Sequence, residues 1–237
     1  MRSTPSLILQ KLVTATAMGI TAVTVPSAWA QVAPSAAEAA AYTGLHAAAQ
    51  KGDTATITRL AAAGASLNAR DSNGRTPVHV ATFARQREVI RVLVKAGADI
   101  HLLDKDRYDA VTIASVADDE ETLRTLLALG ASAKQVTSRY DGTALIAAAH
   151  LGHDGVVRQL IAAGAPLDHV NNLHWTAAIE AVVLGDGGPR HQKTLQALIA
   201  AGANLKLADR HGNTPLQLAR SRGYGEMVKM LEQAGAR

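Results

Sequence analysis

The chain has 237 residues, of which 48% are hydrophobic and only 3% aromatic, and it contains no cysteine. A core built mainly from Ala, Leu and Val favours closely packed helices over a β-sandwich, which needs more β-branched and aromatic residues. The absence of cysteine excludes a disulfide framework and a thiol nucleophile. The formal net charge is +4, and because no Lys/Arg-rich run supplies a phosphate-neutralising surface, a nucleic-acid partner is disfavoured.

Residues 1–30 have the pattern of a bacterial export signal. The segment MRSTPSLILQK carries two bases and no acid, a mainly apolar run comes next over 12–25, and Ala28 and Ala30 form an A-x-A cleavage site. The alternative is an uncleaved membrane anchor, but the run is shorter than the roughly 20 residues of a membrane span and is closed by Pro26. We therefore expect cleavage after Ala30, and a mature protein that is periplasmic or secreted and has no membrane span. The mature chain would hold 22 basic and 20 acidic residues, which is nearly balanced.

Residues 31–40, QVAPSAAEAA, form either a short linker or an N-terminal cap on the rest of the chain. From residue 41 onward the chain repeats itself. Six related segments, each with a Gly-Ala pair after it, are TGLHAAA, TPVHVAT, DAVTIAS, TALIAAA, TAAIEAV and TPLQLAR. The glycine lies 21 residues after the start of its segment in five units and 26 residues after it in the fifth. This register indicates a repeat array, with repeats near 41–71, 72–104, 105–137, 138–171, 172–209 and 210–237.

Each unit predicts two helices, as the second repeat illustrates. Thr76 is a good N-cap, and Pro77 suits the first helical position because its missing N–H costs nothing there. A second helix carries an apolar stripe at helical spacing over 89–94. Gly97 supplies the left-handed residue that ends this helix. One such helix pair cannot bury its apolar stripe alone, so neighbouring pairs must stack.

The TPVHVA segment, the Gly-Ala-Asp after the second helix and the DSNGRTP turn together resemble the ankyrin repeat, over about residues 41–237. The resemblance implies an all-α ankyrin-repeat solenoid of about six helix–turn–helix repeats, with short β-hairpin-like turns along one edge. In this family the Thr-x-x-His histidine, here His46 and His79, resembles a structural partner of the Thr hydroxyl. The third repeat departs from the pattern, because Asp109 replaces the Thr and Thr112 replaces the His. We expect a looser helix start there.

No catalytic motif is found, and the array leaves no room for a separate catalytic domain, so we expect no enzyme, no cofactor and no metal. One alternative is a site at the five-residue insertion in the fifth repeat, where Glu180, Asp186 and His191 could bind a metal or act as acid and base. The insertion is otherwise a solvated loop or a second contact site. Its candidate residues are Gly185, Asp186, Gly187, Gly188, Pro189, Arg190 and His191.

We expect function on the surface, since the turn tips and the first-helix face are the usual partner-contact positions of the ankyrin family. Several large rings stand in polar turns that we expect to be exposed, and Tyr and Trp dominate interface energetics. The alternative is that each ring packs on its neighbouring turn. The candidate partner-binding residues are Tyr42, Arg75, Phe83, Tyr108, Tyr140, Trp175 and Asn213.

The expected function is a non-catalytic, monomeric protein–protein interaction scaffold of the bacterial envelope, with chaperone-like binding of many clients as a second alternative.

Overall fold

The structure is a computed structural model that describes residues 31–237, so the expected export signal at 1–30 lies outside the described residues. The regular secondary structure of the described part is almost entirely helical. A short helix, α1 (Ala36–Ala41), comes before six antiparallel helix pairs. The first helices of the pairs are α2 (Gly44–Lys51), α4 (Pro77–Phe83), α6 (Ala110–Val116), α8 (Ala144–Leu151), α10 (Ala177–Val183) and α12 (Pro215–Ser221). The second helices are α3 (Thr54–Ala62), α5 (Arg87–Lys95), α7 (Glu120–Ala128), α9 (Asp154–Ala162), α11 (Pro189–Ala200) and α13 (Gly225–Gln233).

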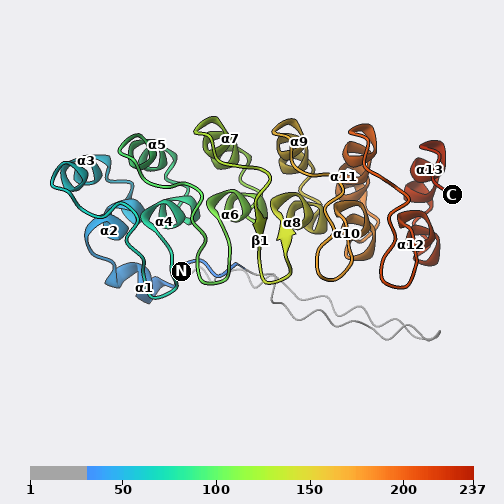
Figure 1. Cartoon of the computed structure of the whole chain (residues 1–237), viewed down its shortest axis with the longest axis horizontal. Helices are drawn as coiled ribbons and strands as arrows, with labels where there is room; N and C mark the ends of the chain where they lie inside the picture. Colours follow the sequence, from blue (N-terminus) through green and yellow to red (C-terminus); the bar gives the residue numbers. More distant parts are fainter. Residues whose placement is uncertain (1–30) are drawn as a thin grey trace, which may run out of the picture. The chain divides into compact units, whose positions relative to one another are not determined.

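The pairs stack in chain order into two rows. In Figure 1 the first helices form one row and the second helices form the other, and the turns that join successive repeats project beyond the first-helix row. One of these turns, the one with an extra residue, is a true hairpin in which β1 (Val136–Thr137) pairs antiparallel with β2 (Gly142–Thr143). The expected all-α solenoid of helix pairs with hairpin-like turns is confirmed.

The stack buries one continuous apolar core. The largest fully buried side chains come from both rows, and in the second repeat they include Ile90 and Leu93, which are 0% exposed. Val78, Val80 and Ala81 of the same repeat are also buried, as their spacing predicts, whereas Val94 is only half-buried. Since each helix pair covers the apolar face of the next, the core has no boundary between repeats.

The second helices all end as the sequence predicts, and the starts of the first helices agree with it except in the first and third repeats. In five of the six repeats the first residue of the segment accepts a hydrogen bond from the backbone N–H three residues later; Thr43 is the exception. The expected looseness of the third repeat is wrong. Asp109 Oδ1 accepts from Thr112 N at 2.7 Å, and Thr112 Oγ1 lies 3.1 Å from Thr137 Oγ1 of the next turn. At the other end, Gly97 takes φ 103° and the other five Gly-Ala glycines are also left-handed.

The five-residue insertion of the fifth repeat divides between a loop and a helix. Residues 184–188 join α10 to α11, whereas residues 84–86 suffice between α4 and α5. The remaining difference lies in α11, which has 12 residues against 9 in α5. Pro189 starts α11 at the first helical position, where its ring is tolerated.

His79 ties the second repeat to the third. Its Nδ1 accepts from Thr76 N at 3.1 Å and lies 2.8 Å from Thr76 Oγ1, while its Nε2 lies 3.1 Å from the carbonyl oxygen of Tyr108. The structural role expected for this histidine is confirmed. His46 makes the same reach to the next turn, with Nε2 3.0 Å from the carbonyl of Arg75, but Thr43 makes no side-chain cap. Burial lowers the pKa of His79 to about 4.

The stability of the array should therefore depend on pH through His79. Because its pKa is lower in the folded chain than in the unfolded chain, the unfolded state binds more protons between pH 6.5 and 4, and stability falls as the pH falls through this range. We expect the free energy of unfolding in urea to drop by about 2 kcal/mol from pH 7.5 to pH 5 on account of this residue.

His79→Gln should remove that part of the pH dependence. Glutamine is a suitable replacement because Gln217 already makes the equivalent capping box in the sixth repeat, accepting from Thr214 N at 2.7 Å. An equal loss of stability between pH 7.5 and pH 5 in the variant and the parent chain would contradict the assignment.

Candidate protein-binding surface

The turn tips share one hydrogen-bonding plan. In the second repeat, Asp71 Oδ1 accepts from the backbone N–H groups of Asn73 and Arg75, both at 2.8 Å. Asp104, Asn171 and Asp209 accept from the equivalent pair of N–H groups in the third, fifth and sixth repeats. These side-chain oxygens turn inward and satisfy the turn backbone, which fixes the shape of these four tips. In the fourth repeat Ser138 takes this position, and its Oγ accepts from Tyr140 N at 3.2 Å.

Backbone hydrogen bonds also join successive tips into a row. Lys105 N donates to Asn73 O at 3.0 Å, Ser138 N to Arg107 O at 2.8 Å, and Asn172 N to Tyr140 O at 2.9 Å. The four tips of repeats two to five are thus held at fixed spacing. A surface held in this way loses little conformational entropy when a partner binds.

A ladder of long side chains reinforces this row. The residue four positions before each first-helix cap reaches back to the preceding tip. Lys105 Nζ donates to Ser72 O at 2.5 Å, Asn172 Nδ2 to Arg139 O at 3.0 Å, and Arg210 Nη2 to Asn172 O at 3.4 Å. The sequence contained a signal for the ladder, since Lys105, Arg139 and Arg210 occupy the same position of their repeats, but sequence reasoning missed it.

The central tips also exchange exposed ion pairs. Arg107 Nη1 lies 2.8 Å from Asp141 Oδ1, and Arg139 Nη2 lies 3.0 Å from Asp106 Oδ1. The side chains are about half exposed, so each pair contributes little to stability. Their effect is to present a mixed-charge surface in a defined arrangement.

Left-handed backbone occurs in the same tips, and also at Arg85 and Asp118 in the connections between paired helices. The residue two positions before each first-helix cap has positive φ in every turn, and it is glycine at Gly74 and Gly212. In the three central turns it is Arg107 (φ 64°), Asp141 (φ 52°) and His174 (φ 65°). Non-glycine residues are sterically strained in this conformation, and strain of this kind concentrates at functional sites.

The predicted contact residues differ in exposure. Tyr140 and Trp175 are half-buried at the tips of the fourth and fifth repeats, and Asn213 is half-buried with its Nδ2 3.3 Å from Asp209 Oδ1. Tyr108 is only 7% exposed, so the expectation of an exposed ring is wrong at this position. The physical reason is its place between two neighbouring turns, where stacking of the repeats removes the side chain from water.

A second group of predicted residues comes together at the N-terminal end of the array. Arg75 is 3% exposed, which also contradicts the expected exposure. Its guanidinium lies 5.8 Å from the centre of the Phe83 ring, so the side chain runs along α4 from the tip toward the far end of that helix. Tyr42 donates its hydroxyl to Asp71 Oδ2 at 2.7 Å. Burial and the neighbouring Asp71 raise the pKa of Tyr42 to about 12.

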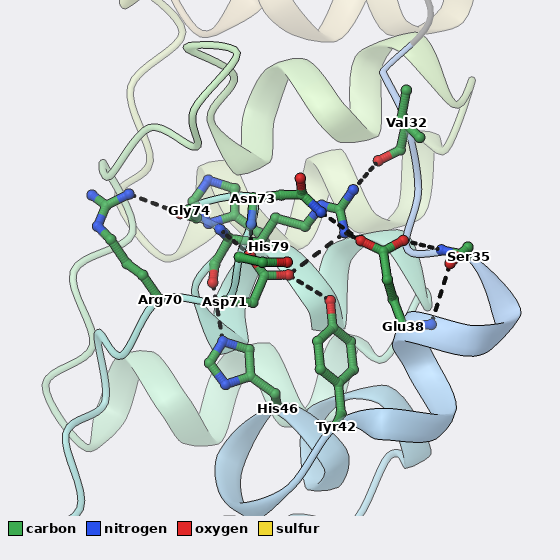
Figure 2. Close-up of polar contacts among 12 residues, drawn as sticks. Val32, Ser35, Glu38, Tyr42, His46, Arg70, Asp71, Asn73, Gly74 and His79 are labelled. Carbon is green, nitrogen blue, oxygen red and sulfur yellow. Dashed lines mark hydrogen bonds and ion pairs between the residues drawn. The ribbon is translucent and has the colours of Figure 1, made fainter.

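The segment 31–41 covers this group. Ser35 and Glu38 start α1 with a reciprocal capping box, and Figure 2 shows how Glu38 then faces Asn73. Asn73 Nδ2 donates to Glu38 Oε1 at 2.5 Å, and Arg75 Nη2 donates to the carbonyl oxygen of Val32 at 2.7 Å. Through these contacts the segment lies against the second repeat.

The insert loop folds back on its neighbours. Arg190 Nε donates to Gly152 O at 3.1 Å, and its Nη2 lies 2.6 Å from Asp118 Oδ2 of the third repeat. On the other side, Tyr224 of the sixth repeat donates its hydroxyl to Gly185 O at 2.9 Å. The loop therefore braces repeats three to six along the edge opposite the turn tips.

The three side chains considered for a metal or acid–base site do not form one cluster. His191 Nδ1 lies 3.0 Å from Asp186 Oδ1, and the hydrogen bond of Asp186 to Gly188 N shapes the turn. Glu180 instead lies inside the stack at 0% exposure. Among residues 31–237 there is no group of three or more His, Asp or Glu side chains placed to hold a metal ion.

Glu180 replaces an apolar residue. The equivalent first-helix positions hold Ala47, Val80, Ile113, Ala147 and Leu218. Its Oε2 lies 3.2 Å from His150 Nδ1, and its Oε1 accepts from Asn171 Nδ2 at 3.0 Å. Burial raises the pKa of Glu180 against the opposing effect of these two partners. Asn171 stands where three of the other four tips carry Asp, and the amide can satisfy both the turn N–H groups and the buried carboxyl.

Asn171→Asp should therefore destabilise the chain. The substitution keeps the turn acceptor but removes the donor and sets two carboxylates together in a buried place, and we expect a loss of about 2–3 kcal/mol at pH 7. The loss of stability should be smaller at pH 5. The two neighbouring carboxyl groups of the variant have a raised pKa in the folded state, so they bind a proton there, and that proton serves as the missing hydrogen-bond donor. Urea unfolding at both pH values measures this.

Asn172→Asp is the matched control, because Asn172 is exposed and its Nδ2 makes one hydrogen bond to Arg139 O. Equal losses in the two variants would contradict the pairing of Glu180 with Asn171.

Comparison with known proteins agrees with this architecture. The family model described as ankyrin repeats (3 copies) matches residues 30–104 and 110–209, and the ankyrin repeat model matches residues 211–237. A curated relative, the ankyrin repeat protein YahD of Escherichia coli (strain K12), is 40% identical over 100 residues. That match covers 42% of this chain and 50% of YahD, so the chain spans about half the length of the curated relative.

Solved structures match over more of the chain. An ankyrin repeat domain from Acinetobacter baumannii AYE is 44% identical with a TM-score of 0.77, over 81% of this chain and 98% of that domain. The ankyrin repeat domain of Bcl-3, a member of the IkappaB protein family, is 29% identical with a TM-score of 0.74, over 83% and 88%. Ankyrin-repeat proteins are typically non-catalytic scaffolds that bind other proteins. With six stacked helix pairs and family matches along nearly all of its described length, the chain belongs to the ankyrin-repeat family.

Proposed function

We propose that this protein is a non-catalytic, monomeric scaffold of the bacterial envelope that binds a partner protein through the turn tips of its central repeats and the adjoining first-helix face. The proposal extends the general role of the family to a particular surface and compartment. The export-signal pattern expected in residues 1–30 supports the compartment, and the row of tips supports the surface. None of the described helices is long and apolar enough to cross a membrane.

The assignment of the surface rests on one observation. Backbone hydrogen bonds join the tips of repeats three to five, and each of these tips contains a non-glycine residue in the left-handed conformation. Strained left-handed residues persist where the surroundings hold them, and here they present Arg107 and His174 beside the half-buried rings of Tyr140 and Trp175. Aromatic and arginine side chains on a rigid base are the usual anchors of protein interfaces. Stability alone would favour glycine in these turns, as at Gly74 and Gly212.

The alternative of a ligand site at the insert receives less support from the contacts. Arg190, His191 and Gly185 are each engaged by neighbouring repeats. We assign the insert a bracing role in the stack. Chaperone-like binding of many clients would need a broad apolar surface, whereas the tips carry defined charges and two rings.

Variants at the tips test the proposed surface. We expect Tyr140→Ala with Trp175→Ala to weaken partner binding at least tenfold, since buried aromatic anchors each contribute about 1–4 kcal/mol. The partner would be captured from envelope extract with the immobilised chain, identified by mass spectrometry, and measured by calorimetry. Tyr108 is left unchanged because its burial would confuse lost binding with lost packing.

His174→Gly is the sharper variant. Glycine relieves the left-handed strain, so the melting temperature should stay the same or rise while binding falls. Asp186→Ala on the opposite edge, with a side chain 79% exposed, is the matched control and should bind normally. Full affinity in both tip variants, or capture of many unrelated clients, would contradict the proposal.

Export is tested separately. We expect the chain expressed with its first thirty residues in a Gram-negative host to appear in the osmotic-shock fraction, and Edman sequencing of that material to begin at Gln31. A full-length chain retained in the cytoplasm or in membranes would contradict export with cleavage.

A further inference from the structure

The second repeat holds a peptide in the structure, and the peptide is the chain's own N-terminal segment. Arg75, Phe83 and Tyr42 are three of the residues that family resemblance assigns to partner contact, and residues 31–41 lie over them. The contacts of this segment therefore show which chemistry this part of the surface recognises (Figure 2).

The recognising groups are a buried guanidinium and an amide donor. The Arg75 side chain is 4% exposed, and its Nη1 lies 3.5 Å from both Asp71 Oδ2 and Glu38 Oε1. Asp71 balances the charge of Arg75 through Nη1, but the guanidinium has further N–H donors, among them those of Nη2, that need acceptors once the side chain is buried. The segment supplies two of them, the Val32 carbonyl and the Glu38 carboxylate.

The segment itself is weakly attached. Helix α1 has six residues and buries none of them, and Val32 is 64% exposed. A helix this short is not stable alone, and the few part-buried hydrogen bonds that the segment makes to the Arg75 guanidinium contribute about 1.5–3 kcal/mol each. None of residues 31–38 is fully buried, so another peptide with the same acceptors can replace them.

We propose that Arg75 and Asn73 form an acidic-peptide-binding site on the first-helix face of the second repeat, which residues 31–41 occupy until an acidic segment of the partner protein displaces them. The site extends the central tip surface toward the N-terminal end of the array. The peptide it takes carries a backbone carbonyl acceptor and, six residues later, a carboxylate at the start of a helix. The statement that the occupant is a segment of the partner protein rests on the proposed function. The existence of the acidic-peptide site does not depend on that function.

A peptide titration tests the site without any partner. The probe is a synthetic peptide with the sequence of residues 31–41, acetylated and amidated, added to the ¹⁵N-labelled chain from Gln31 to Arg237. In the Glu38→Ala chain the resident segment is weakened, and we expect the peptide to shift the Asn73 side-chain amide and Arg75 Nε signals. The unaltered chain should need at least tenfold more peptide, since a tethered segment acts at an effective concentration of about millimolar.

Three controls test whether the peptide binds at Arg75 and through its carboxylate. A peptide with Gln in place of its Glu should bind the Glu38→Ala chain at least fivefold more weakly, because the site requires a carboxylate. Arg75→Gln added to Glu38→Ala should abolish the shifts. Glu232→Ala, which removes an exposed carboxylate paired with Arg220 at 2.6 Å in the last repeat, should bind peptide like the unaltered chain.

Absence of shifts in the Glu38→Ala chain, or equal binding of the Glu and Gln peptides, would overturn the proposal even if the Arg75 variant failed to fold. Once a partner protein has been captured, the Glu38→Ala chain should bind it more tightly than the unaltered chain does. The peptide should compete with the partner for binding to the chain. If the tip variants bind the partner normally but the peptide still binds at Arg75, the tip surface is wrong and the acidic-peptide site stands.

Discussion

Everything in this molecule depends on one constraint: no repeat can bury its apolar face without a neighbour. Each helix pair exposes a stripe such as that of Ile90 and Leu93, and only the next pair removes it from water. Stacking then fixes the distance between successive turns, because both helices of every repeat are packed. The regular tip-to-tip hydrogen bonds result from this spacing, as does the reach of His79 to the carbonyl of Tyr108.

Polar groups have two separate uses in this stack. Carboxylates and amides such as Asp71 and Asn171 accept hydrogen bonds from the backbone N–H groups of their own turn. Lys105 and Arg210 instead donate hydrogen bonds to carbonyl oxygens of the preceding tip. Glu180 places a carboxyl group in the core, and the neighbouring tip there carries Asn171, which donates a hydrogen bond to it. The groups that shape the tips are therefore distinct from the groups that the tips present to solvent. That separation lets the surface vary without disturbing the stack.

The two ends of the candidate surface differ in what covers them. At the central tips, the left-handed residues Arg107 and His174 are exposed. At the second repeat, the segment 31–41 supplies acceptors to the buried guanidinium of Arg75. The insert of the fifth repeat acts at neither end, because its contacts to Asp118 and Tyr224 brace the opposite edge. The proposed binding surface and the bracing insert thus lie on opposite edges of the array.

The sequence by itself determined the repeat period, the helix caps, the left-handed glycines and the buried stripes, because each depends on residues within one unit. It could not determine the exposure of Tyr108 and Arg75, since a turn residue is covered or bare according to what the neighbouring repeat and the N-terminal segment place over it. It also grouped Glu180 with Asp186 and His191, which lie close in the chain but are directed to different partners. The repeat period depends only on residues within one unit. The burial of a polar side chain depends on the residues that neighbouring units place over it.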